Sequence, residues 1–132
     1  MKVVAVVAAA IFSPCGKNLF IARRAKNAHQ GGLWEFPGGK KEENESAEQA
    51  LVRELQEELG IMATDYQRLM EVHHDYGDKQ VHLDIFTVHD FAGEAHGAEG
   101  QQTQWVSLTQ LSELAFPEAN KPIIERLLQV YA

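Results

Sequence analysis

The chain is organised around residues 38–61, which read GGKKEENESAEQALVRELQEELGI. The second half of this stretch predicts a helix, because Ser46 followed by Gln49 fits a capping box and the residues after them are strong helix formers. Gly60 fits the position that follows a helix. The two glycines that open the stretch let the backbone approach a ligand or a metal closely. We therefore expect one helix between Ser46 and Gly60, preceded by Gly38-Gly39.

Three carboxylates lie on this helix, at Glu54, Glu57 and Glu58. Their i, i+3 and i+4 spacing confines them to an arc of about 100°. The apolar stripe of the helix consists of Ala47, Leu51, Val52, Leu55 and Leu59. Glu54 and Glu58 lie at one margin of this stripe, beside an expected cleft. Clustered carboxylates suit a hard cation such as Mg²⁺, which shares its remaining coordination sites with phosphates. From the helix alone, a solvated acidic face is the alternative interpretation.

Composition and charge limit the class of protein. With 132 residues, 45% of them apolar and 23% charged, we expect one domain that covers residues 1–132. The single cysteine, Cys15, excludes an internal disulfide framework and is compatible with a reducing compartment, so we expect a cytoplasmic protein. The net charge of −7 argues against binding of a nucleic-acid polymer. An acidic enzyme still binds an acidic substrate when a divalent cation lies between them.

Strands are expected on both sides of the central helix. The apolar run Val3–Ile11 is too short to span a bilayer and is rich in valine, so we interpret it as a buried strand and expect no membrane association. The expected strands are 3–12, 18–23, 66–74, 81–89 and 102–106, with an extended piece at 33–36. Residues 24–32 and 40–45 are expected to be irregular, and two helices are expected at 108–114 and 121–130. This order indicates a mixed α/β or α+β domain.

The fixed positions of the central stretch resemble the Nudix box. They are Gly39, Glu45, Arg53-Glu54-Leu55, Glu57-Glu58 and Gly60-Ile61, separated by five, seven, one and one residues. So many matched positions make the signal specific, and they favour a functional site over a solvated acidic face. The resemblance implies a hydrolase that acts on a nucleoside diphosphate joined to another group. It also implies an α/β/α sandwich around a mixed β-sheet.

The resemblance assigns roles to residues in and near the box. It implies that Mg²⁺, for which Mn²⁺ can substitute, is bound by the Gly38 carbonyl, Glu54, Glu57 and Glu58. It implies that Glu99 is a further metal ligand or a general base, whereas without the resemblance Glu99 reads as a surface acid. Either Glu54 or Glu99 takes the proton from the attacking water. Arg53 orients a carboxylate and offsets part of its charge.

Nearly the whole chain resembles the MutT-type members of this family. The matching segments include 20–25, 28–29, 35–40, 99–101 and 116–122. The resemblance implies hydrolysis of 8-oxo-dGTP by water attack at the β-phosphorus, which releases the monophosphate and pyrophosphate. The expected partner is a small nucleotide, and a monomer is expected. The implied substrate-binding residues are Arg24, His29, Glu35, Phe36, Pro37, Gly38, Lys40, Asp78 and Asn120.

Asn120 carries the argument for an oxidised base. Oxidised guanine has a hydrogen on N7 and still accepts at O6, and an asparagine amide offers an acceptor and a donor side by side. Against ordinary guanine, the amide oxygen would face the N7 lone pair, which disfavours that base. The alternative is that Asn120 only caps the last helix, ahead of Lys121 and Pro122.

Several assignments and two other functions stay open. Arg24 contacts either phosphate or O8 of the base, His29 either touches the nucleotide or lies in a solvated loop, and Phe36 lines either the base pocket or the core. Residues 30–34 and 76–81 depart from the MutT pattern. A pyrimidine nucleotide pyrophosphohydrolase, acting on CTP or methylated dCTP, is therefore one alternative function. A catalytically silent nucleotide-binding module is the other.

Overall fold

A mixed seven-stranded β-sheet lies at the centre of the computed structural model, which describes residues 2–24 and 32–132. The strand order is β3-β2-β1-β6-β5, with β4 paired to β1 and β7 paired to β2. The bounds are β1 (Lys2–Phe12), β2 (Asn18–Arg23), β3 (Trp34–Glu35), β4 (Gly38–Lys40), β5 (Met62–Asp75), β6 (Lys79–Ala92) and β7 (Thr103–Ser107). Strands β1 and β6 run parallel and the other pairs described are antiparallel, so the sheet is mixed.

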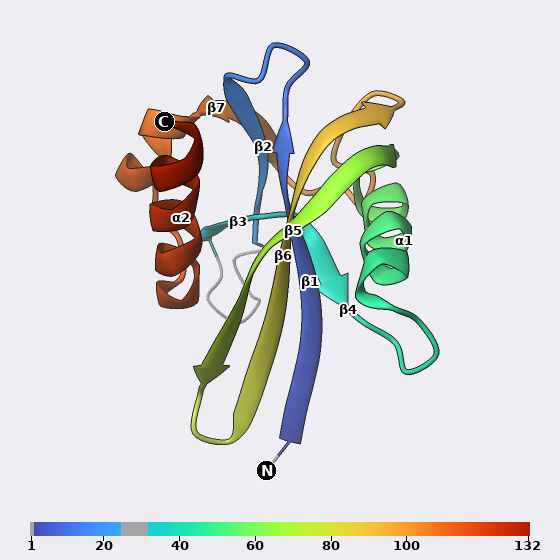
Figure 1. The fold of residues 1–132 in the computed structure, drawn as a ribbon, viewed down its shortest axis with the longest axis vertical. Helices are drawn as coiled ribbons and strands as arrows, with labels where there is room; N and C mark the ends of the chain where they lie inside the picture. Colours follow the sequence, from blue (N-terminus) through green and yellow to red (C-terminus); the bar gives the residue numbers. More distant parts are fainter. Residues whose placement is uncertain (1, 25–31) are drawn as a thin grey trace.

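Helices cover the two faces of the sheet. Helix α1 (Ala47–Leu59) lies on one side and α2 (Lys121–Tyr131) on the other (Figure 1). Two short 3₁₀ segments, η1 (Leu108–Glu113) and η2 (Glu118–Asn120), precede α2. The α/β/α sandwich expected from the sequence is therefore confirmed.

The apolar run in β1 supplies both cores. Val7, Ala9 and Ile11 pack into the cluster that contains the buried face of α1. The alternate residues of the same strand, including Ala8 and Phe12, pack into the cluster that contains the buried face of α2. Side chains alternate between the faces of a strand, so a central strand buried on both faces must be apolar without interruption.

The ends of α1 follow the sequence signals. The Gln49 N–H donates to Ser46 Oγ at 3.1 Å, and the Ser46 N–H donates to Gln49 Oε1 at 2.8 Å, which completes the capping box. Gly60 has a φ of 71°, and its N–H donates to the carbonyl oxygens of Gln56 and Leu55. This left-handed cap ends the helix and turns the chain toward β5.

Several expected bounds differ from the structure, and the short helix expected at 108–114 is the 3₁₀ segment η1. The β5–β6 hairpin is longer than the predicted segments 66–74 and 81–89, because its pairing reaches from Met62↔Ala92 to Asp75↔Gln80. The prediction of an irregular 40–45 is wrong at its first residue, because Lys40 pairs with Val6 as the last residue of β4. Among the residues described, no helix combines the length and apolar character needed to cross a membrane.

Ser46→Ala should lower the free energy of unfolding by about 1 kcal/mol, because the Gln49 N–H loses its acceptor. Urea denaturation followed by circular dichroism measures this change. Ser112→Ala is the matched control, since Ser112 is exposed and caps no helix start; its effect should stay within about 0.5 kcal/mol. Equal effects of the two substitutions would contradict the role of the capping box.

Candidate active site

Arg53 organises the acidic groups around α1. Its Nε and Nη2 donate to the two carboxylate oxygens of Glu45 at 3.0 and 2.7 Å, and Nη2 also donates to the Lys40 carbonyl at 3.0 Å. Its Nη1 donates to Glu54 at 3.0 Å and to Glu57 at 3.2 Å. The hydrogen bonds from Arg53 hold the pKa of Glu45 at about 2. One guanidinium thus fixes three carboxylates and joins the helix to the end of β4.

Glu58 lies deeper than the margin position expected from the helical pattern, with only 9% of its surface exposed. Its Oε2 accepts a hydrogen bond from the Gly38 N–H at 3.2 Å. Burial, followed by the charge of Glu35, raises the pKa of Glu58 to about 8. Burial also raises the pKa of Glu54, although Arg53 opposes this shift. The negative charge of these neighbouring carboxylates is therefore only partly offset by Arg53.

The glycines of β4 allow the helix to approach the sheet. A Cβ at Gly39 would collide with the carboxylate of Glu54, and a Cβ at Gly38 would collide with the backbone oxygen of Val7. Neither glycine has a positive φ. What this short strand requires from glycine is therefore space, and the space is filled by a glutamate on one side and by β1 on the other.

Glu99 lies in an exposed loop that is tied to the end of α1. The Glu58 carbonyl accepts hydrogen bonds from the Ala98 N–H at 3.0 Å and from Gln101 Nε2 at 3.1 Å. Gln101 Oε1 accepts in turn from the Glu99 N–H at 3.0 Å. The charge of Glu99 contributes to the raised pKa of both Glu54 and Glu58. Gln101 lies in the matching segment 99–101, and only the fold reveals that it anchors this loop.

A cavity of about 270 Å³ opens beside β4 on the α2 side of the sheet. Arg24 and Glu35 form an ion pair of 2.7 Å in its wall. Burial raises the pKa of Glu35, and Arg24 opposes this shift. The ring of Phe36 stacks on that of Phe116 with centroids 5.3 Å apart. The cavity thus combines an apolar aromatic wall with a few polar groups, as small-molecule sites commonly do.

Asn120 lines the same cavity and makes no capping hydrogen bond with its side chain. Its backbone N–H donates to the Pro117 carbonyl at 2.9 Å, which fixes the residue at the start of α2. The Asn120 amide therefore does not cap α2, which argues against the alternative that this residue serves only as a helix cap. Gly38 and Gly39, the glycines that contact Glu58 and Glu54, also line this cavity.

The other implied substrate residues lie in different places. Lys40 lines the cavity, whereas Pro37 is buried next to it, with its carbonyl accepting from the Ala9 N–H at 2.8 Å. Asp78 is exposed in the turn between β5 and β6 and is absent from the lining, so its contact with substrate stays a prediction. His29 lies outside the described residues. Trp34 is buried in the core.

Residues of β1 and of the β5–β6 hairpin that line the cavity were missed by the sequence analysis: Val4, Val72, His74, Tyr76, Lys79 and Leu83. On β5, Val72 and His74 are two residues apart, as expected for side chains on one face of a strand, and Tyr76 follows directly after the strand ends at Asp75. That period could have identified them once the strand ends were known. The predicted segment 81–89 was too short to include Lys79, whereas Tyr76 lies in the turn beyond the end of β5.

The glutamates fit a hard divalent cation. The available donors are carboxylate oxygens of Glu54, Glu57 and Glu58 together with the carbonyl of Gly38, which is the all-oxygen set that such cations prefer. Glu57 is 57% exposed and therefore accessible from solvent. A buried glutamate with one hydrogen bond, surrounded by further carboxylates, gains most from a bound cation.

Gly39→Ala should weaken Mn²⁺ binding at least about tenfold while changing stability little, because the new methyl group displaces only the flexible end of Glu54. Gly38→Ala is the informative comparison, since its methyl group meets the backbone of β1 and should mainly lower stability. Electron paramagnetic resonance of free Mn²⁺ and thermal unfolding measure the two effects. Unchanged Mn²⁺ affinity in Gly39→Ala would contradict this placement of the cation.

Comparison with known proteins agrees with this geometry. The family model described as NUDIX domain matches residues 7–126. An 8-oxo-dGTP diphosphatase of Escherichia coli (strain K12) is 40% identical over 121 residues, covering 92% of this chain and 94% of the relative. A CTP pyrophosphohydrolase of the same strain is 39% identical over 132 residues, covering 100% of this chain and 96% of the relative.

A solved structure shows the same fold. It comes from a study of MutT from Aliivibrio salmonicida and Vibrio cholerae, is 42% identical, and superposes with a TM-score of 0.86 over 97% of this chain and 98% of that chain. Nudix hydrolases depend on a divalent metal, which agrees with the oxygen donors around α1. The match over residues 7–126 and these relatives show that the chain belongs to the Nudix family of hydrolases.

Proposed function

We propose that this Nudix hydrolase converts 8-oxo-dGTP to 8-oxo-dGMP and pyrophosphate with Mg²⁺, or Mn²⁺ in its place, and so removes an oxidised nucleotide before it enters DNA. The observation that carries the proposal is the Asn120 amide, which lines the cavity and is not used in capping α2. Relatives named 8-oxo-dGTP diphosphatase at 40% and 46% identity support the same substrate.

The base would occupy the cavity, with its N7–H and O6 against the Asn120 amide. The amide oxygen accepts from N7–H and the amide nitrogen donates to O6, a pair that unoxidised guanine cannot form. Phe36 and the Phe116 ring stacked on it would give the base an apolar surface, and Arg24 would lie near the polar edge of the base. The triphosphate then points past Gly38 and Gly39 toward the glutamates.

The glutamates of α1 and the Gly38 carbonyl would hold the cation, which neutralises phosphate oxygens when bound. Arg53 engages Oε1 of Glu54, while Oε2 faces Gly39. A water positioned there loses its proton to Glu54 Oε2 as its oxygen bonds to the β-phosphorus. The bond between the β-phosphorus and the oxygen that bridges to the α-phosphorus breaks, and the monophosphate leaves with that oxygen. Glu99 would act as a further ligand from its tethered loop.

A pyrimidine nucleotide is the second candidate substrate. The specific observation in its favour is the CTP pyrophosphohydrolase, which is 39% identical over the whole chain. Initial rates for 8-oxo-dGTP, dGTP and CTP, each well below its KM, separate the candidates. The proposal expects the highest kcat/KM for 8-oxo-dGTP, whereas a preference for CTP would overturn it. Release of no monophosphate from any of these nucleotides would indicate a silent binding module.

Glu54→Gln should lower kcat at least about 100-fold while the Kd of the nucleotide stays nearly unchanged, because the amide keeps the shape of the side chain but cannot take the proton. Steady-state kinetics and calorimetric titration measure the two constants. Glu48→Gln is the matched control, since Glu48 is an exposed glutamate in the first turn of the same helix. Near-normal turnover in Glu54→Gln would exclude Glu54 as the base.

Asn120→Ala should lower the ratio of kcat/KM for 8-oxo-dGTP to that for dGTP about tenfold, the discrimination that a well-formed pair of hydrogen bonds supplies. Its stability should change little, because the Asn120 side chain makes no capping hydrogen bond. Asn44→Ala, at an exposed asparagine outside the cavity, should leave the ratio unchanged. An unaltered ratio in Asn120→Ala would refute this mode of base recognition.

A further inference from the structure

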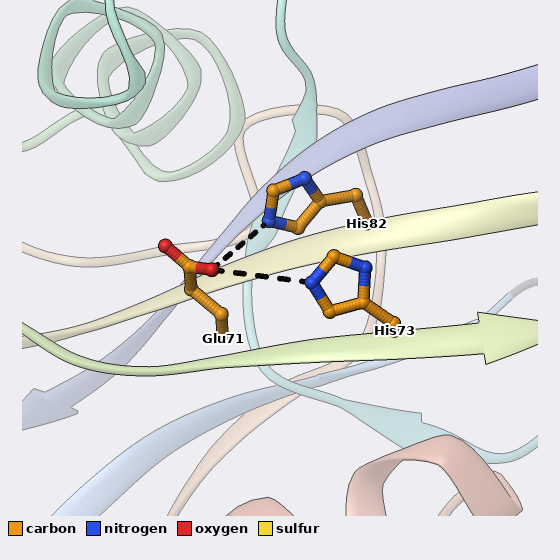
Figure 2. Close-up of side chains that lie close together, drawn as sticks. All are labelled: Glu71, His73 and His82. Carbon is orange, nitrogen blue, oxygen red and sulfur yellow. Dashed lines mark ion pairs between the residues drawn. The ribbon is translucent and has the colours of Figure 1, made fainter.

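A second group of potential metal ligands lies on the β5–β6 hairpin. Glu71 and His73 come from β5, and His82 comes from β6. In the register of the hairpin His73 pairs directly with His82, and Glu71 pairs with Asp84. Figure 2 shows a nitrogen of each imidazole ring turned toward the Glu71 carboxylate. One ligand atom from each of Glu71, His73 and His82 lies within 4.8 Å of the others.

The distances suit a small cation between these atoms. The Glu71 carboxylate oxygen Oε2 lies 3.5 Å from His82 Nε2 and 3.9 Å from His73 Nε2. Ligand atoms of a tetrahedral Zn²⁺ site lie about 3.4 Å apart, as follows from bond lengths of about 2.0–2.1 Å. The two imidazole rings stack with centroids 4.2 Å apart. The ring planes are only 22° apart, so side-chain rotations would have to turn both nitrogens toward one ion.

One buried polar atom of the group and one beside it lack hydrogen-bond partners among the described residues. Among the residues described, His82 Nε2 and Asp84 Oδ1 are both inaccessible to solvent and without a hydrogen bond. These two atoms lie 3.8 Å apart. Buried polar atoms are normally satisfied, and an ion is one explanation when they are not. Asp84 adds a second carboxylate beside the group, which increases its attraction for a cation.

The position of the group separates it from the nucleotide cavity. Val72 and Leu83 line that cavity, so the alternate residues of both strands face the opposite side of the sheet. There His82 pairs across the sheet with Ala5 of β1, whose small side chain leaves room beside the ring. The hairpin extends beyond both helices at this end of the molecule (Figure 1).

We propose that Glu71, His73 and His82 bind a transition-metal ion of the Zn²⁺ class on the sheet face opposite the nucleotide cavity. Two imidazoles and one carboxylate are ligands that Zn²⁺ uses in proteins, with water at the fourth position. The ion joins β6 to β5, the edge strand of the sheet, and so clamps the hairpin whose other face lines the cavity. This site is distinct from the all-oxygen site of α1, which suits a harder cation.

Arg68 is the cationic group that competes for these carboxylates. Its Nε lies 3.6 Å from Asp84 Oδ1, and its Nη1 lies 3.7 Å from Glu71 Oε1. Both contacts are longer than a hydrogen bond. The Glu71 oxygen that faces the histidines is Oε2, so the arginine and the ion engage different oxygens.

Calorimetric titration of the full chain with ZnCl₂, in the presence of excess MgCl₂, tests the proposal without any nucleotide. We expect one site with micromolar affinity, a rise in Tm, and ¹⁵N shifts of two histidine side chains. His73→Gln should weaken that site at least about tenfold, since even residues that only orient metal ligands cost about 10- to 100-fold when mutated. His73 is 70% exposed, so its replacement leaves the fold intact. Glu71→Gln should weaken the site similarly.

His96→Gln is the matched control, because His96 is an exposed histidine outside the group. It should leave the zinc affinity unchanged. The proposal is overturned if no site binds zinc in the micromolar range, or if His73→Gln and Glu71→Gln bind zinc as tightly as the unmodified chain. Because binding is read without nucleotide, these outcomes do not depend on the proposed hydrolase substrate.

Discussion

The close approach of α1 to β4 is the constraint on which the active site depends. Two glycines without side chains let the helix come so near that the Glu54 carboxylate occupies the space of a Gly39 side chain and Glu58 reaches the Gly38 N–H. Arg53 then ties the same helix to Glu45 and to the Lys40 carbonyl. A cation that binds at these glutamates therefore meets carboxylates whose positions are set before it arrives, which lowers the cost of organising the site.

The sheet places the two halves of the proposed reaction next to each other. Strand β4 carries Gly38 and Gly39, which border the cavity and also contact the glutamates of α1. Asn120 reaches the cavity from the start of α2, on the other face of the sheet from α1. A nucleotide that spans β4 can thus present its base to one helical layer and its phosphates to the other. The sandwich architecture, with a short glycine strand between the layers, makes this possible.

Local signals in the sequence predicted the local features of this structure. The capping box at Ser46, the cap at Gly60 and the uninterrupted apolar β1 each depend on neighbouring residues, and each was confirmed. The depth of Glu58 was not predictable, because it depends on how far the glycines let the helix approach the sheet. The tether through Gln101 and the pairing of β4 with β1 depend on contacts distant in sequence, which periodicity does not report.

The spacing of the whole motif indicated a site that the acidic helix alone did not. Three carboxylates on one helix arc are common on solvated surfaces, and only the spacing to Gly39, Glu45 and Arg53 distinguished a site. In the structure these three residues supply the space and the guanidinium that hold the acids together. Glu71, His73 and His82 of the hairpin belong to no such motif, so their proximity became visible only with the register of β5 and β6.

A crystal structure of the chain with Mn²⁺ and a non-hydrolysable analogue of 8-oxo-dGTP, recorded with anomalous diffraction at the manganese edge, tests the central claim most directly. We expect a manganese peak among Glu54, Glu57, Glu58 and the Gly38 carbonyl, with the base in the cavity and its N7–H donating to the Asn120 amide oxygen. A manganese peak elsewhere, or a base bound outside the cavity, would contradict it.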